Sequence, residues 1–133
     1  QQNDTLKKLD LQNNDVGKEG AKALADALKQ NHTLEELYLE SYSPETAKKL
    51  VKIGQNTGGM EEANLKEQGF TNIVAHFLAG ALQQNDTLKK LYLGDNKMGN
   101  EGATALADAV KQNRTLEKLD LQNNDVGKEG AKA

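Results

Sequence analysis

The stretch TLKKLDLQNNDVGKEGAKALADALKQN, residues 5–31, contains both of the patterns that decide the fold. Near its start Leu9 and Leu11 alternate with polar residues, which predicts a short strand with both leucines on one face. Further along, apolar residues recur at positions i, i+3, i+4 and i+7, which predicts an amphipathic helix. The residues of this stripe are Ala21, Leu24, Ala25 and Leu28. Asn, Asp and Gly lie between the two patterns and favour a turn there, so the stretch predicts one strand followed by one helix.

This strand and helix pattern recurs along the whole chain. Residues 1–9 reappear unchanged at 83–91, and residues 9–23 reappear unchanged at 119–133. The Thr-Leu step that opens a unit falls at Thr5, Thr33, Thr87 and Thr115, so the spacings are 28, 54 and 28 residues. A regular period of this size indicates a repeat protein, and the long spacing has room for two units.

Substitutions hide the boundary inside the long spacing. Met60, Ala63 and Leu65 take the three leucine positions of the first strand, which places the boundary at Gly59. The unit before this boundary has a shorter loop between its strand and its helix. The chain is therefore predicted to be one array over residues 1–133. Its parts are a tail at 1–4, full units at 5–32, 33–58, 59–86 and 87–114, and a partial unit at 115–133.

One unit alone cannot bury both its strand leucines and its helix stripe. Stacked units can, because each strand then extends a parallel sheet and each helix packs on the next helix. We therefore expect a single continuous sheet and a single layer of helices.

The pattern TLxxLxLxxNxVGxEGAxALAxALxxN resembles the leucine-rich repeat, in particular the 28-residue strand and helix type of ribonuclease inhibitor and NOD-like receptors. An Asn three residues past the last strand leucine, at Asn14, Asn96 and Asn124, carries this resemblance together with the Gly-Ala helix opening. The resemblance implies an α/β fold. This would be a right-handed solenoid of four full repeats and a partial fifth, with parallel strands on the concave side and helices on the convex side. It further implies that the chain binds other proteins and lies in the cytoplasm.

The second and third units depart from the pattern at the position of this Asn. Tyr42 and Gln68 stand there instead. In the family that the chain resembles, the Asn side chain hydrogen-bonds the backbone of adjacent coils, so we expect Tyr42 to leave those backbone groups to water or another partner. The residues that follow, Ser43 and Pro44, suit an N-cap and a first helical position, which predicts that the helix of this unit is retained.

The five aromatic residues all lie in the second to fourth units, and their positions predict two different roles. Phe70 takes the position of Val16, and Phe77 falls on the helix of the third unit, so both are expected in the core. Tyr38 and Tyr92 instead occupy the outward strand position, which would place them about 14 Å apart on the concave face of a continuous sheet.

Rigid amphipathic side chains such as tyrosine are typical anchors at protein interfaces. We therefore predict a contact patch for a protein partner on the concave face. Its residues are Tyr38, Tyr92, Glu36, Glu40, Asn64, Lys66 and Lys90. The alternative is that both tyrosines are solvated residues on a β surface that suits them.

Composition argues against several other functions. The chain has 17 basic and 20 acidic residues, and binding to nucleic acid needs a clustered basic surface, so no nucleic acid partner is expected. No apolar run approaches the roughly 18 residues that cross a bilayer, so no membrane contact is expected. There is no cysteine, and neither His32 nor His76 lies beside a plausible nucleophile, since His76 matches the outward position of Lys22. We predict no catalytic residue, no metal ligand and no cofactor.

The leading prediction is a non-enzymatic module that binds a protein partner on the concave sheet face. A second is a structural spacer or a self-associating array, because the two ends carry copies of the same repeat that could stack head to tail. A third is regulation of a small GTPase, an activity of some proteins with this type of repeat.

Overall fold

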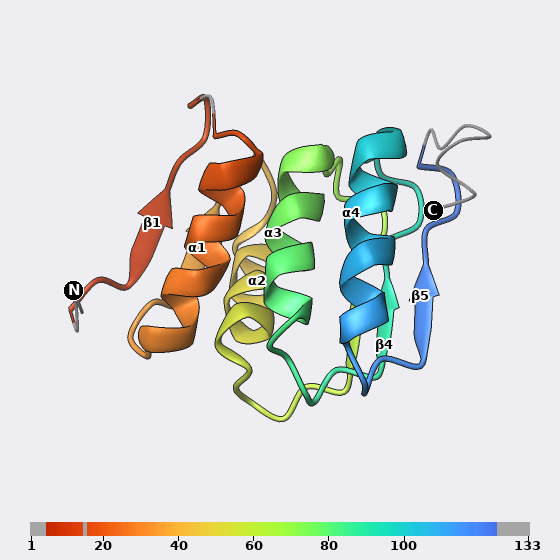
Figure 1. Cartoon of the computed structure of the whole chain (residues 1–133). Coiled ribbons are helices and arrows are strands. Elements are labelled where there is room, and N and C mark those ends of the chain that lie inside the picture. Colours follow the sequence, from red (N-terminus) through yellow and green to blue (C-terminus); the bar gives the residue numbers. More distant parts are fainter. Residues whose placement is uncertain (1–4, 15, 125–133) are drawn as a thin grey trace.

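The computed structural model describes residues 5–14 and 16–124 (Figure 1). Short strands and helices alternate along these residues. In chain order they are β1 (Lys8–Asp10), α1 (Lys18–Gln30), β2 (Glu36–Tyr38), α2 (Pro44–Gln55), β3 (Glu62–Asn64), α3 (Asn72–Leu82), β4 (Lys90–Tyr92), α4 (Gly99–Gln112) and β5 (Lys118–Asp120). Each strand pairing in these residues is parallel, so the predicted α/β alternation with parallel strands is confirmed. The expected fifth unit is described only as far as Asn124.

The apolar positions of strands and helices meet in one core between them. The middle residues of β2, β3 and β4, which are Leu37, Ala63 and Leu91, are buried. The helix stripe of the first unit packs against this core, as its periodicity predicts. Phe70 and Phe77 are fully buried, which confirms that both are core residues. None of the helices in residues 5–14 and 16–124 combines the length and the hydropathy of a membrane span.

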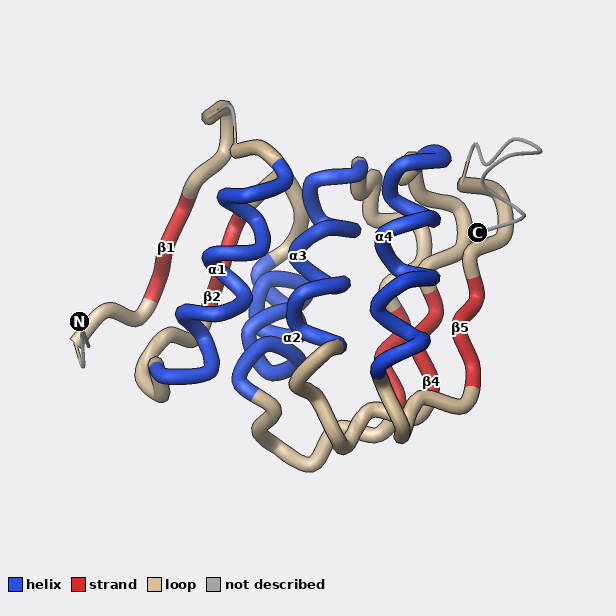
Figure 2. Tube along the Cα trace, in the orientation of Figure 1, coloured by secondary structure: helices blue, strands red, loops and turns tan. Residues whose placement is uncertain are grey.

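The strands form two sheets, and the prediction of one continuous sheet is wrong. β1 pairs with β2, whereas β3, β4 and β5 form a separate sheet in that order. α2 lies between the two sheets, behind α1 and α3 in the view of Figure 2. From α2 the Lys49 ammonium donates to the backbone carbonyl of Asn64 in β3, at 3.3 Å. The loop of residues 39–43 is shorter than the corresponding loops 11–17 and 65–71. As a result, α2 begins close to β2 and packs against that strand.

The displacement of α2 brings α1 directly against α3, and α3 packs in turn against α4 (Figure 1). Small residues allow this close approach. A Cβ atom placed on Gly80 of α3 would lie 3.0 Å from the Cβ of Ala25 in α1, and one on Gly102 of α4 would lie 2.9 Å from the Cβ of Ala75. As a result, every residue of α3 from residue 74 to residue 82 is buried.

Asparagine side chains connect the turns that follow neighbouring strands. Asn96 is 3% exposed, and its Nδ2 donates to the carbonyls of Leu65 at 3.0 Å and Leu93 at 2.9 Å. Its Oδ1 accepts from the backbone N–H groups of Gln68 at 2.8 Å and Phe70 at 3.1 Å. One side chain thus satisfies four backbone groups of two units, which a buried turn requires.

Tyr42 in the second unit does not link two units as Asn96 does. The carbonyl of Leu11, which corresponds to that of Leu65, accepts from Asn14. This fits the prediction that Tyr42 leaves groups of the adjacent coil to water or another partner. Tyr42 instead hydrogen-bonds backbone groups of its own unit. Its hydroxyl donates to the carbonyl of Leu37 at 2.7 Å and accepts from the N–H of Leu39 at 2.8 Å. Its ring stacks on Tyr38, with centroids 5.7 Å apart, and meets Phe70 edge to face at 5.5 Å. A phenol reaches these groups across the shortened loop and fills the space beside the core.

Candidate protein-binding surface

Within the described residues, the sheet of β3, β4 and β5 has helices on one face only, because α3 and α4 pack on its inner side (Figures 1 and 2). Its other side is called here the outer sheet face. The parallel register sets its residues in rows across the strands. One row is Glu62, Lys90 and Lys118, and the next is Asn64, Tyr92 and Asp120. Lys66 follows β3 on the same side, and most of these side chains are exposed.

Tyr92 lies at the centre of the outer sheet face, on the middle strand. The ammonium groups of Lys66 and Lys118 lie 5.5 Å and 5.3 Å from the centroid of its ring. Cations at this distance are attracted by the electron density of an aromatic face, so both lysine chains lie against the half-buried ring. Among the described residues, the hydroxyl of Tyr92 has no hydrogen-bond partner, so this polar group is available to a partner molecule.

Tyr38 lies in the other sheet and is only 6% exposed, so it is not the exposed anchor that its strand position predicts. Its ring stacks on Tyr42, the ammonium of Lys8 lies 5.2 Å from its centroid, and its hydroxyl donates to Glu36 at 2.5 Å. The hydrogen bond to this carboxylate, helped by burial, raises the pKa of Tyr38 to about 12. Because the two sheets are separate, the distance of about 14 Å between two tyrosines of one continuous sheet does not apply.

Glu40 also has a role inside the fold. Its carboxylate accepts hydrogen bonds from the backbone N–H of Thr71, at 3.0 Å, and from the Thr71 hydroxyl. Thr71 is the N-cap of α3, so Glu40 ties the loop of the second unit to the start of that helix. A negative charge is stabilising at this end of a helix, which explains an acid at this position without any partner.

The structure therefore divides the predicted contact patch. Four of its residues share the outer sheet face, and these are Asn64, Lys66, Lys90 and Tyr92. The other three, Tyr38, Glu36 and Glu40, belong to the second unit and make contacts within the fold. Lys118 and Asp120 were missing from the prediction and lie in register with Lys90 and Tyr92. The repeat alignment could have identified them, because it gives them equivalent strand positions.

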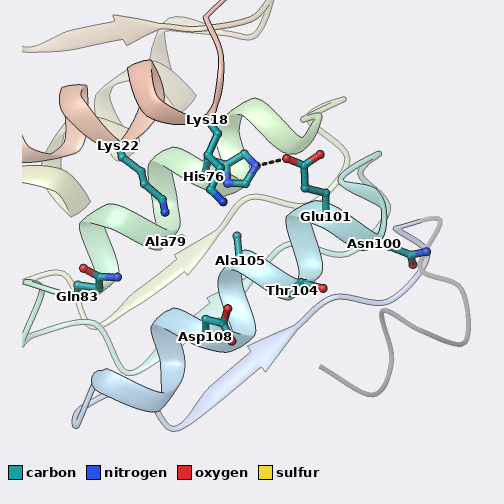
Figure 3. Close-up of a pocket in the computed structure, with 10 residues that line it drawn as sticks. All are labelled: Lys18, Lys22, His76, Ala79, Gln83, Asn100, Glu101, Thr104, Ala105 and Asp108. Carbon is teal, nitrogen blue, oxygen red and sulfur yellow. Dashed lines mark hydrogen bonds and ion pairs between the residues drawn. The ribbon is translucent and has the colours of Figure 1, made fainter.

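The helical side of the molecule carries a second feature, a hollow between α1, α3 and α4 (Figure 3). The prediction that His76 points outward is wrong, since its side chain is 2% exposed there. Its Nε2 lies 2.9 Å from the carboxylate of Glu101, which also accepts from Asn72 at 3.1 Å. These two hydrogen bonds, that of His76 first, lower the pKa of Glu101. The direct packing of α1 on α3 is what buries the histidine.

Within residues 5–14 and 16–124, no three His, Cys, Asp or Glu side chains are placed to hold a metal ion together.

Repeated strands and helices with an asparagine-linked turn define a repeat protein. The family model for the leucine-rich repeat matches residues 2–25, 84–107 and 112–133, which together are more than half of the chain. The chain belongs to the leucine-rich repeat family. No curated protein matches it. The matched segments leave out the second unit and most of the third, which are the units that carry Tyr42, Gln68 and the displaced α2. Repeats of this family generally mediate contacts between proteins, and they are typically not enzymes.

Proposed function

We propose that the chain is a non-enzymatic protein-binding module whose partner contacts the outer sheet face, with Tyr92 as the central anchor. One observation carries this proposal. An aromatic ring stands in the middle strand of a sheet that none of the described helices covers on this side, and two ammonium groups lie 5.5 Å and 5.3 Å from its centroid. Tyrosines at the centre of a surface patch commonly contribute a large share of binding energy, because they bury a large area at a small cost in side-chain entropy.

The charges around Tyr92 indicate the chemistry of the partner. Lys66, Lys90 and Lys118 lie on this face with Glu62 and Asp120, so positive charges are in excess close to the ring. A partner that places acidic side chains opposite the lysines and an apolar group on the ring would complement the outer sheet face. Charges at the rim of such an interface mainly affect the association rate and its dependence on salt.

We further assign the repeats to the 28-residue ribonuclease-inhibitor-like type, arranged as a right-handed solenoid of four full units and a partial fifth over residues 1–133. The 28-residue spacing of the Thr-Leu steps and the asparagines after the strands support this assignment. The interruption between β2 and β3 is then a local departure within the second unit. A chain with this repeat and no cysteine suits a reducing compartment, so we assign it to the cytoplasm.

The test compares the binding of one partner to three variants of the full chain. A partner recovered by pull-down with the wild-type chain is titrated against Tyr92→Ala, Tyr92→Phe and the control Lys48→Ala, which removes an exposed charge from α2. We expect Tyr92→Ala to weaken binding about 30-fold, which corresponds to about 2 kcal/mol, and Tyr92→Phe to weaken it much less. Tyr92→Ala binding as tightly as the wild type, or a loss only with Lys48→Ala, would refute the proposal.

Head-to-tail association of the chain with itself is the alternative use of its surfaces. Sedimentation velocity over a wide range of concentrations decides this point, because stacking end to end increases the mass with concentration. A constant monomer mass would remove the alternative.

A further inference from the structure

The hollow on the helical side lies away from the outer sheet face and has a volume of about 340 Å³. Its floor is α3, with His76 and Ala79, and its two walls are α1 and α4 (Figure 3). The wall from α1 is basic and carries Lys18 and Lys22. The wall from α4 is acidic and carries Glu101 and Asp108. Figure 3 shows the two lysine side chains extending from α1 toward α3.

The acidic groups of this hollow already have donors. Glu101 accepts from His76 at 2.9 Å and from Asn72 at 3.1 Å. Asp108 pairs with the ammonium of Lys111, one turn further along α4, at 3.7 Å. Neither carboxylate therefore needs a cation from outside.

The basic groups have no partner at this short distance, although Lys18 is close enough to help lower the pKa of Glu101. Among the described residues, neither Lys18 nor Lys22 has an acidic oxygen within ion-pair distance. Nδ1 of His76 is the buried side-chain nitrogen that has no hydrogen-bond partner in this part of the chain. Because Nε2 donates its hydrogen to Glu101, a protonated ring presents an N–H at Nδ1 that needs an acceptor. In its protonated form the ring therefore lacks an acceptor at Nδ1, and an anion in the hollow would supply one.

We propose that this hollow binds an oxyanion, the phosphate or carboxylate group of a small molecule, between Lys18, Lys22 and Nδ1 of His76. The exposed Lys18 side chain moves aside to admit the anion and then neutralises it together with Lys22. A volume of about 340 Å³ is larger than a bare anion needs and is within the range of small-molecule sites, so the ligand also has a polar body. This body contacts Thr104 and Gln83.

Binding of the anion is coupled to the uptake of one proton by His76. The charged groups that line the hollow together with the ring are Lys18 and Lys22 on α1 and Glu101 and Asp108 on α4. A protonated ring without the anion has an unpaired N–H in a buried place beside two ammonium groups, which is unfavourable. The anion removes both penalties. The anion therefore binds the protonated ring more tightly than the neutral ring.

The test uses inorganic phosphate and acetate as probes, each titrated into the full chain with sodium chloride at equal ionic strength as the reference. Nitrogen-15 NMR spectra of the histidine rings report the protonated fraction of His76. We expect one probe to saturate at millimolar concentration and to increase that fraction. Saturation with phosphate but not acetate identifies a phosphate ligand, and the reverse identifies a carboxylate.

Four variants connect the signal to this hollow. Lys18→Ala and Lys22→Ala should each weaken binding about fivefold or more, since each removes one charged donor. His76→Gln keeps a donor for Glu101 but has no group at Nδ1, so it should abolish the pH dependence. Lys29→Ala removes the same charge from the last turn of α1, outside the hollow, and should change nothing.

The proposal is overturned if neither probe saturates below about 50 mM, or if chloride gives the same response. It is equally overturned if Lys18→Ala and Lys22→Ala bind the probe as Lys29→Ala does. Thermal unfolding of each variant shows that it is folded. Because Tyr92 is not in this hollow, the result is independent of the proposed protein-binding function.

Discussion

Replacing Tyr42 by Phe removes one hydroxyl group that holds the turn after β2. This hydroxyl satisfies the carbonyl of Leu37 at 2.7 Å and the N–H of Leu39 at 2.8 Å, and Phe satisfies neither. A backbone group that loses its partner in a partly buried place costs about 1 to 1.5 kcal/mol. We therefore expect the free energy of unfolding to decrease by about 2 to 3 kcal/mol, which for a chain of this size lowers Tm by roughly 10 °C.

For the variant Tyr42→Asn, the sequence pattern and the structure predict opposite changes in stability. The pattern has Asn at this position, so a consensus argument predicts that Tyr42→Asn is stabilising. The structure predicts the opposite, because Asn removes the ring that contacts Tyr38 and Phe70. Loss of a large packed ring costs about 3 to 5 kcal/mol, more than the hydrogen bonds of an Asn can return. Tyr42→Asn should therefore be less stable than Tyr42→Phe.

The assay is urea unfolding followed by circular dichroism, with the stability taken from the midpoint at an unchanged slope. Tyr92→Phe is the matched control, because it removes the hydroxyl of a tyrosine that makes no hydrogen bond within the described residues. It should change stability by less than about 0.5 kcal/mol. The reasoning is refuted if Tyr42→Phe is as stable as Tyr92→Phe, or if Tyr42→Asn is more stable than the wild type.

Two further predictions concern the same framework. Asn96→Ala should lower the free energy of unfolding by about 3 kcal/mol or more in urea unfolding, since four backbone groups lose their partner. Asn14→Ala should cost less than about 1 kcal/mol, because Asn14 is exposed and its hydrogen bonds are 3.3 Å long. Equal losses for the two variants would contradict this ranking. Because the pKa of Tyr38 is raised to about 12, its neutral form stabilises the fold fully below about pH 10 and this contribution is lost as the pH rises toward 12. Tyr38→Phe should therefore make the free energy of unfolding fall less steeply with pH across that range. Part of the pH dependence should remain, because burial raises the pKa of Tyr42 even further than that of Tyr38. If the pH dependence of stability is unchanged in Tyr38→Phe, Tyr38 is not involved.

The local elements could be predicted from the sequence because their signals are local. The alternation of Leu9 and Leu11 and the helix stripe that follows require only the periods of a strand and a helix. The alignment also placed a strand at Glu62–Asn64, where Ala63 replaces the usual leucine, and β3 forms there. Phe70 could be assigned to the core for the same reason, since its repeat position is an inward one.

The candidate surface was predictable only where the repeat is regular. Asn64, Lys90 and Tyr92 share a face because equivalent strand positions of paired strands lie in one row. Tyr38 has the same strand position, but the shortened loop brings Tyr42 against its ring and buries it. The hydrophobic period of the sequence does not predict the contact between Tyr42 and Tyr38, because this contact depends on the length of the tyrosine side chain and of the loop.

The sequence by itself determined the order of strands and helices, their inward faces and the family of the chain, because hydrophobic periods specify which side of each element is buried. Only the tertiary structure decided what each buried side meets. α2 buries one face, which includes Ala47, Leu50 and Ile53, and lies between two sheets, and α1 packs on α3 in its place. This exchange of neighbours turns His76 from an outward position into a buried one beside Lys18 and Lys22. The physical reason is that the burial of apolar area is not directional. The hydrophobic period therefore determines which face of a helix or strand is buried, whereas loop length and the close approach that glycines allow determine which element packs against that face.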